Sequence, residues 1–459
     1  GKRAFGEFLA LPVLVVAGVI GLAVALYIAD DTWSQGGNDP YGWLSRLLGD
    51  AGSLGSLLST VASSIITVTS ITFSLLLIAL QQGSSALTAQ VTDQFLMRRA
   101  NQFYFGYFVG LSIYVLMTLV TVSSVHLPVL GTAAALLLTA VALCMIVVMI
   151  YNTIDQMRPA QIVRAIRGHI VRARQRERDF LAGTRRTPRA GFELLTVVES
   201  EESGHVARID LDALRKALGQ ARPEGDLEIE IGATPGCFVA YRDPLARLRI
   251  RAGEKLDSVG RDRLVEAVRG AFKLEDGRDL TCDPSYGLTQ LATIGWRSVS
   301  TAKSNPSPGL AVVETLRDII ARWLADGPAE EDPDSPIVCA DGAMVAALDA
   351  LELIGLVASE SIQSQTISSV LRSVAMLLPS ASAETVTALA SLVRRSLSAL
   401  GEHVPTRELM SALEMLEAAL ATAGLGGCAE DVGAARCDFA LCVGQLNSRS
   451  TRVPGTKQT

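Results

Sequence analysis

Residues 54–82 of the chain, LGSLLSTVASSIITVTSITFSLLLIALQQ, contain no charged side chain. A helix needs about 20 mostly apolar residues to cross the roughly 30 Å hydrocarbon core of a bilayer. Residues 54–80 meet this requirement, so the stretch predicts a transmembrane helix. A long uncharged helix of this kind is typical of membrane proteins, and the rest of the chain is interpreted around it.

Three further stretches are long and apolar enough to span a membrane: residues 8–29, 103–125 and 129–150. The first follows Lys2 and Arg3, as the apolar region of a signal peptide would. Its 22 residues exceed the usual length of about 7–15 for such a region, and no small-residue cleavage site follows cleanly. We therefore expect it to remain as a span, which gives four in all.

Charged residues divide the chain unequally. Only 8 of the 144 positions from 8 to 151 are charged, compared with 77 of the 308 positions from 152 onward. This division excludes a purely soluble enzyme and a transporter made almost wholly of transmembrane helices. The expected fold class is an α-helical membrane protein with four transmembrane helices, followed by a cytoplasmic α+β region composed of a small β module and an α-helical bundle.

The basic residues beside the spans predict the orientation. The loop of residues 30–53 has four acidic residues and one arginine, whereas residues 152–190 have ten arginines and a net charge of +7. Lysine and arginine accumulate in cytoplasmic segments. We therefore expect a multi-pass protein of the bacterial inner membrane with both termini in the cytoplasm.

The pattern along the chain predicts five parts. Residues 1–151 form the transmembrane domain and residues 152–190 a basic juxtamembrane helix and linker. Residues 191–255 alternate short β-branched runs with Gly and Pro, which indicates a β module with one helical insertion. Apolar spacings of three and four residues predict seven or eight helices within residues 256–447, and residues 448–459 form a polar tail.

The juxtamembrane arginines have two expected partners. Basic residues next to a span commonly contact anionic lipid headgroups. Residues 191–459 carry a net charge of −12, so the same side chains could contact the protein's own acidic region. The candidates are Arg158, Arg164, Arg167, Arg172 and Arg174. Nucleic acid is not an expected partner of so acidic a region.

Common catalytic and metal-binding motifs are absent from the sequence. It has no phosphate-binding G-x-x-x-x-G-K-[ST], no G-x-S-x-G and no H-E-x-x-H. The four histidines lie far apart in the sequence. The spacing of Cys428, Cys437 and Cys442 matches no common zinc pattern. We expect no enzymatic activity, no cofactor, no metal site and no catalytic residue.

The second span carries hydroxyl side chains at alternating spacings of four and three residues. These are Ser56, Thr60, Ser63, Thr67, Ser70 and Ser74, and Gln81 continues the series seven residues later. This spacing places all of them on one helical face, called here the hydroxyl stripe. Small polar residues let helices pack closely, but a stripe of this length could also line a water-filled path between subunits. Both interpretations remain open.

The stripe leads to two functional hypotheses. The first is a homo-oligomeric, channel-like protein of the inner membrane, with the second helix lining the path and a large cytoplasmic vestibule or sensor domain. The second is a membrane-anchored interaction or scaffold protein, whose cytoplasmic domain binds an unknown protein partner and whose stripe serves only for packing. In either case the expected partners include a second copy of the chain and membrane lipids.

Several motifs occur in an order that resembles a known family. They are FSLLLIALQQGSSALTAQV (73–91), FLMRRANQFYFGYFVGLSIYVLM (95–117), SGHVARID (203–210), GCFVAYRDPLA (236–246) and DPSYGLTQLATIGWRSVS (283–300). In this order they resemble the bacterial family of predicted membrane proteins called DUF2254, over roughly residues 54–321. The resemblance implies a membrane location and a shared fold.

Overall fold

The computed structural model describes residues 2–35, 50–86, 99–123, 127–156, 159–221, 226–278, 283–300, 306–397, 400, 403 and 405–441. The chain divides into two compact units, unit 1 (residues 1–162) and unit 2 (residues 163–459). The boundary falls inside a helix, eleven residues after the expected end of the transmembrane domain at residue 151. Each unit is described separately.

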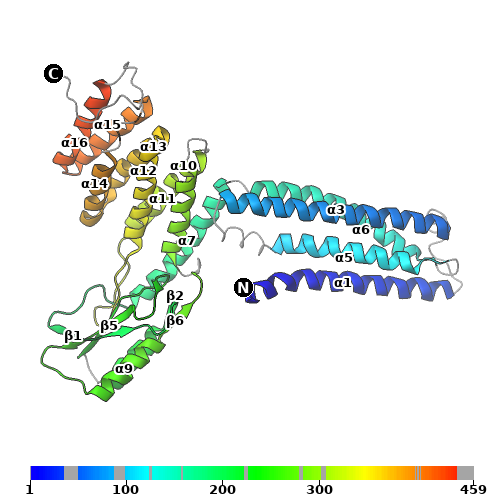
Figure 1. Cartoon of the computed structure of the whole chain (residues 1–459), viewed down its shortest axis with the longest axis horizontal. Helices are drawn as coiled ribbons and strands as arrows, with labels where there is room; N and C mark the ends of the chain where they lie inside the picture. The colour runs from blue at the N-terminus through cyan, green and yellow to red at the C-terminus, as the bar shows by residue number, and fades with distance from the viewer. Residues whose placement is uncertain are drawn as a thin grey trace. The chain divides into compact units, whose positions relative to one another are not determined.

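The described part of unit 1 contains four long helices that lie side by side (Figure 1). They are α1 (Lys2–Gln35), α3 (Ala51–Ala86), α5 (Arg99–Thr121) and α6 (Val129–Gln156). Each contains a segment long and apolar enough to span a membrane: Ala10–Thr32, Ala51–Ser74, Arg99–Thr121 and Val129–Asn152. The four predicted spans are therefore confirmed. The third ends four residues earlier than expected, because Val122 and Ser123 leave the helix.

Helix α5 contacts all three other helices of unit 1 and forms the centre of its core. Its small residues permit a close approach to α1. A Cβ atom on Gly106 would lie 2.8 Å from the Cα of Pro12, and one on Gly110 would lie 3.4 Å from the Cα of Val16. The large side chains Tyr114, Phe108 and Leu111 of α5 are almost completely buried.

Polar groups inside unit 1 bond to the backbone of α6. The buried carboxylate of Asp30, near the end of α1, accepts hydrogen bonds from the amides of Leu130 and Gly131, each at 3.0 Å. These amides belong to the first turn of α6, where free N–H groups attract a negative charge. The Tyr114 hydroxyl donates to the carbonyl of Gly131 at 2.8 Å. The N-terminus of α6 is therefore held by both α1 and α5.

Unit 2 begins with α7 (Pro159–Ala182) and continues into two small sheets. The four-stranded sheet has the order β1-β5-β3-β7, and the three-stranded sheet has the order β4-β2-β6. Strands β3 and β7 are parallel, and the other pairs are antiparallel. The elements are β1 (Phe192–Glu199), β2 (Gly204–Ile209), α8 (Leu211–Ala221), β3 (Leu227–Ile231), β4 (Phe238–Val239), β5 (Pro244–Arg251), α9 (Ser258–Gly270), β6 (Phe272–Glu275) and β7 (Ile337–Val338).

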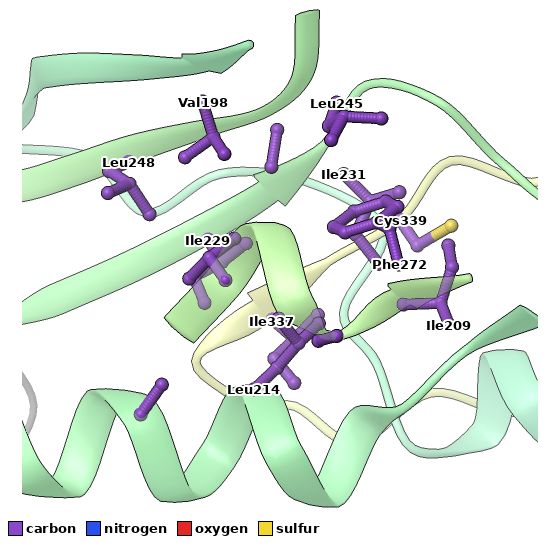
Figure 2. Packing of buried hydrophobic residues seen from close by; sticks show 14 of the residues in the cluster. Val198, Ile209, Leu214, Ile229, Ile231, Leu245, Leu248, Phe272, Ile337 and Cys339 are labelled. Carbon is purple, nitrogen blue, oxygen red and sulfur yellow. The ribbon is translucent and has the colours of Figure 1, made fainter. Parts of the chain in front are cut away.

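Both sheets and helices α8 and α9 share one hydrophobic core. Figure 2 shows Ile337 of the four-stranded sheet beside Leu214 of α8, while Val198 and Leu248 of the same sheet lie on the opposite side of the cluster. Phe272 of the three-stranded sheet belongs to the same cluster. Successive side chains of β3 and β5 point to opposite faces of the four-stranded sheet, and one of these faces lies in this core.

The sheets extend beyond the expected β module of residues 191–255. Strands β6 and β7 lie in residues 256–447, which were expected to be helical only. The stretch 183–190, expected to be a linker, is also part of this fold. The amide of Arg185 donates to the carbonyl of Ile337, and its carbonyl accepts from the amide of Cys339, both at 2.8 Å. Bridges and strands this short leave no periodic pattern in a sequence, which explains the difference.

The remaining described part of unit 2 is helical. It contains α10 (Pro284–Val299), α11 (Ser307–Asp326), α12 (Ala343–Glu360), α13 (Ser364–Leu377), the short 3-10 helix η1 (Leu378–Ser380), α14 (Ala383–Leu397), α15 (Arg407–Thr422) and α16 (Gly426–Leu441). With α9, these make eight α-helices in the described part of residues 256–447, in agreement with the expected seven or eight. The predicted polar tail, residues 448–459, lies outside the described residues.

Gly106 provides a test of the packing between α1 and α5. Gly106→Ala places a methyl group 2.8 Å from the backbone of Pro12, so the two helices must separate. We expect this overpacking to reduce stability by about 1–3 kcal/mol. The matched control is Gly55→Ala on α3, where a Cβ atom meets nothing within 4 Å. Thermal unfolding in detergent checks both, and equal melting temperatures for the two variants would contradict the packing described.

Candidate functional site

The hydroxyl stripe lies on the exterior of unit 1. Ser56, Thr60, Ser63, Thr67, Ser70 and Ser74 are all exposed. The side of α3 that packs into the core of unit 1 carries Leu58, Ala62 and Ile65. With about 3.6 residues per turn, Leu58 and Ile65 lie roughly opposite Ser56 and Ser63. The stripe therefore points away from the helices of its own unit. The side chain of Gln81 lies outside the described residues.

Three of the six hydroxyl groups of the stripe donate hydrogen bonds within α3 itself. Thr60 donates to the carbonyl of Ser56 at 2.9 Å, Thr67 to that of Ser63 at 2.8 Å, and Ser74 to that of Ser70 at 3.0 Å. Each hydroxyl oxygen keeps lone pairs that can accept a further hydrogen bond. The surface of the stripe is thus small, polar and uncharged.

The exposed face of α6 has a different composition. It carries Leu137, Val141, Leu143 and Val147, with Leu137 67% and Val147 68% exposed. Such a face is suited to lipid chains, because it is apolar throughout. The contrast between α3 and α6 marks the hydroxyl stripe as a separate kind of surface on the same unit.

A hollow of about 390 Å³ lies beside the stripe, between α3 and α5. Ile66, Ser70 and Phe73 line it from α3, and Val109 and Leu116 are among its residues from α5. At its base the hydroxyls of Thr69 and Ser112 lie 3.4 Å apart, and Thr69 also donates to the carbonyl of Ile65 at 2.7 Å. The hollow is mostly apolar and can receive a side chain from outside the unit.

The candidate arginines lie in three different environments. Arg158 lies outside the described residues. Arg164 and Arg172 are exposed on α7, so their charged groups are accessible to an anionic ligand. Arg167 forms an ion pair with Asp318 of α11 at 2.5 Å. Arg174 is buried and belongs to the polar cluster described next.

The Arg174 cluster joins α7 to the segment before α12. The guanidinium of Arg174 donates to Asp341 through two nitrogens, at 2.8 and 2.6 Å, and to Glu177 at 2.6 Å. It also lies 5.2 Å from the ring centre of Trp323, a cation–π distance. Burial disfavours ionisation of Asp341, but the hydrogen bonds and charge of Arg174 outweigh it and lower the pKa of Asp341. Burial raises the pKa of Glu177, and Arg174 offsets that only in part.

A second buried cluster brings two of the family motifs together. Asp283 caps α10 by accepting a hydrogen bond from the amide of Tyr286 at 3.1 Å, and Arg278 donates to its carboxylate at 3.0 Å. Gly236 has a φ of 91°, and a Cβ atom there would lie 1.9 Å from the Asp283 carboxylate. The motif beginning at Gly236 therefore fits against the motif beginning at Asp283 only because the former has no side chain there.

The sequence indicated Arg174 as a possible contact of the acidic region but did not identify its partners, and it gave no indication of the cluster around Asp283. The Asp-Pro pair at 283–284 is a sequence signal for a helix start, since Asp caps a helix and Pro fits its first position. No local pattern identified Asp341 as the partner of Arg174, 167 positions away. Each arginine in these clusters is charge-paired, so the clusters act as internal ties between elements.

The thiol of Cys339 lies near the Arg174 cluster. Burial raises the pKa of the nearby Cys339 thiol to about 12, which keeps it protonated and a poor nucleophile at neutral pH. In the part of the chain that the structure describes, no group of three or more His, Cys, Asp and Glu residues could hold a metal ion.

Comparison with known proteins links the chain to one family. The family model described as "Predicted membrane protein (DUF2254)" matches residues 6–352. No curated protein and no solved structure matches the chain. The matched range begins in α1 and ends in α12, so it includes all four spans, both sheets and both buried clusters.

Neutralising Asp341 and neutralising Glu177, the two carboxylates around Arg174, should have different effects on the free energy of unfolding. The lowered pKa of Asp341 means that its carboxylate contributes stability above its unfolded pKa of about 3.9, and that this contribution is lost as the pH falls through the folded value. We expect Asp341→Asn to reduce the free energy of unfolding by about 1–3 kcal/mol at pH 7, with a smaller effect in acid.

Glu177→Gln is the matched control. Because the pKa of Glu177 is raised, the stability contributed by its carboxyl is present below the unfolded pKa of about 4.3 and is lost as the pH rises through the folded value. At pH 7 this variant should be as stable as the natural protein or more so. Denaturant unfolding of the full chain in detergent, followed by tryptophan fluorescence, measures both. A larger loss for Glu177→Gln than for Asp341→Asn would show that the assignment is wrong.

Proposed function

We propose that this chain, which belongs to the DUF2254 family of predicted membrane proteins, forms a homo-oligomer. In this oligomer the α3 helices line a path across the membrane. The observation that supports this most is the outward position of the hydroxyl stripe. Hydroxyl side chains gain no favourable contact from lipid chains, whereas facing copies of the stripe would form a continuous polar surface. A second stripe would supply further hydrogen-bond partners for these hydroxyl oxygens.

The residues on either side of the stripe favour a ring. Ile66 and Phe73 flank it on the side of the hollow, whereas Ile71 and Ile78 flank it on the opposite side, at about 100° per residue around the helix. All four side chains are exposed. Packing one flank of a subunit against the other flank of its neighbour is a heterologous contact, which closes into a ring when the rotation permits. The stripes would then face the common axis.

The chemistry of the stripe favours passive conduction. None of its described residues is ionisable, so it offers no relay for coupled proton transport. Hydroxyl groups can replace part of the hydration of a solute in a narrow path. The proposal therefore assigns the protein a channel-like role in transport and assigns it no catalytic activity and no cofactor.

The proposal retains the expected orientation in the bacterial inner membrane. Ten arginines in residues 152–190, against one arginine and four acidic residues in residues 30–53, favour a cytoplasmic location for both termini and for unit 2. In this arrangement unit 2 forms a vestibule or sensor. Arg164 and Arg172 remain available to anionic headgroups.

An interaction scaffold is the second candidate. Unit 2 exposes two methionines, Met376 on α13 and Met415 on α15, and these two helices contact each other. Exposed methionine is common on surfaces that bind protein partners. In this case the hydroxyl stripes would pack tightly between copies without a path, and pull-down with the full chain should recover a partner of unit 2.

The first test of the path uses Thr67→Leu and Ser70→Leu. Each replaces a hydroxyl in the middle of the stripe with a bulky apolar group. Such a group obstructs a narrow path and excludes water from it. We expect the flux of small solutes from liposomes to fall at least tenfold in the double variant. Val147→Leu on the exposed face of α6 is the control and should leave flux unchanged. Unchanged flux in the double variant would contradict the path.

A second test concerns the symmetry. Thr67→Cys places a thiol in the stripe, so copies that face one another should form disulfide-linked oligomers under mild oxidation in membranes. Val147→Cys, on a face assigned to lipid, should yield no more cross-linked product than the natural protein. A Thr67→Cys variant that remains monomeric would rule out facing stripes, whatever the flux result.

A further inference from the structure

A hollow of about 760 Å³ lies on the exterior of unit 1 between α1, α5 and α6, away from the hydroxyl stripe. This volume is within the range of roughly 300–1,000 Å³ that is usual for small-molecule sites. Its walls are apolar and include Leu11, Phe103 and Cys144. Among the described residues that line it, only Arg99, the first residue of α5, is charged.

Hydrogen bonds between α5 and α6 establish the relative direction of the two helices that line the hollow. Asn152 donates to the hydroxyl of Tyr104 at 3.1 Å, and Tyr107 donates to the carbonyl of Leu138 at 2.8 Å. The two helices are therefore antiparallel, and Arg99 lies near the end of the span formed by α6. The α6 wall extends from Ala140 to Val148, or roughly 12 Å at 1.5 Å per residue. This is close to half of the roughly 30 Å hydrocarbon core.

The hollow is open to the surrounding hydrocarbon. Phe103, Val141 and Val148 line it and are exposed on the surface of unit 1, and Cys144 is exposed as well. A ligand could therefore enter sideways from the bilayer. Such an entry suits a molecule that is already dissolved in the membrane and carries a long apolar chain.

The positive charge of Arg99 at the end of the hollow restricts which lipid headgroups can bind there. Arg99 is exposed and is the first residue of the candidate span Arg99–Thr121, so we expect it at the boundary between the hydrocarbon and the headgroup layer. No ion pair within the described part of the chain involves Arg99. A guanidinium binds a phosphate through two parallel hydrogen bonds, so it is well suited to a lipid phosphate at this depth.

We propose that this hollow is a binding site for an anionic phospholipid of the leaflet that faces Arg99. One acyl chain lies along Phe103, Cys144 and Val148, and the headgroup phosphate contacts Arg99. The site lies on different helices from the hydroxyl stripe, and it would stabilise the arrangement of α1, α5 and α6 by binding the folded unit only. It is independent of whether α3 lines a path.

Native mass spectrometry of the full chain, released from mild detergent, tests the site. Phosphatidylglycerol and phosphatidylcholine with identical acyl chains are the two probes. The natural protein should retain more phosphatidylglycerol. Arg99→Gln should reduce that preference about fivefold, since one basic residue near the surface contributes roughly 1 kcal/mol to binding an anionic lipid. Arg99→Lys should keep most of it.

Filling the hollow should have a different effect. Cys144→Trp occupies the space of the acyl chain, so it should reduce retention of both lipids. The control is Val120→Trp on α5, at a side chain that is 85% exposed and does not line the hollow. Retention unchanged by both Arg99→Gln and Cys144→Trp would overturn the proposal. Equal losses in Val120→Trp and Cys144→Trp would do so too, because they would indicate general loss of annular lipid.

Discussion

Hydrocarbon supplies no hydrogen-bond partners, so every polar group that unit 1 places in the membrane must be satisfied within the protein. This constraint explains why the unit consists of long helices, and it also explains the details between them. The Asp30 carboxylate accepts hydrogen bonds from amides in the first turn of α6, where N–H groups have no partner within the helix, and the Tyr114 hydroxyl donates to the Gly131 carbonyl of the same turn. Thr60 and Thr67 of α3 meet the same requirement by donating to carbonyls of the preceding turn.

Because Thr60, Thr67 and Ser74 donate to carbonyls of α3 itself, these side chains lie on the outside of the unit at a reduced cost. The exterior of unit 1 then has surfaces of several kinds: a polar stripe on α3, an apolar face on α6, and a hollow with a basic end between α1, α5 and α6. Each kind suits a different neighbour. The stripe suits another polar stripe, the α6 face suits lipid chains, and the hollow suits a lipid with an anionic headgroup.

In unit 2 the corresponding constraint is the cost of burying charge, which is high unless the charge is paired. Arg174 is paired with Asp341 and Glu177, and Arg185 is paired with the completely buried Glu228. The pairs Arg174–Asp341 and Arg185–Glu228 join segments far apart in the sequence. Together they fix α7 and the stretch that follows it to the sheets and helices, so the basic segment after the membrane is built into unit 2 and is only partly available to lipid.

The sequence by itself determined the four spans and the common face of the hydroxyls, because hydropathy and the 3.6-residue period are local properties of a helix. It also predicted the number of C-terminal helices. Other features depended on partners distant in the sequence: the two-residue strand β7, the docking of residues 183–190, and the pairing of Arg174 with Asp341. The outward orientation of the hydroxyl stripe also depended on partners distant in the sequence. Only the packing of Leu58 and Ile65 against α5 and α6 turned the hydroxyls outward, because large apolar side chains fill the core better than small polar ones.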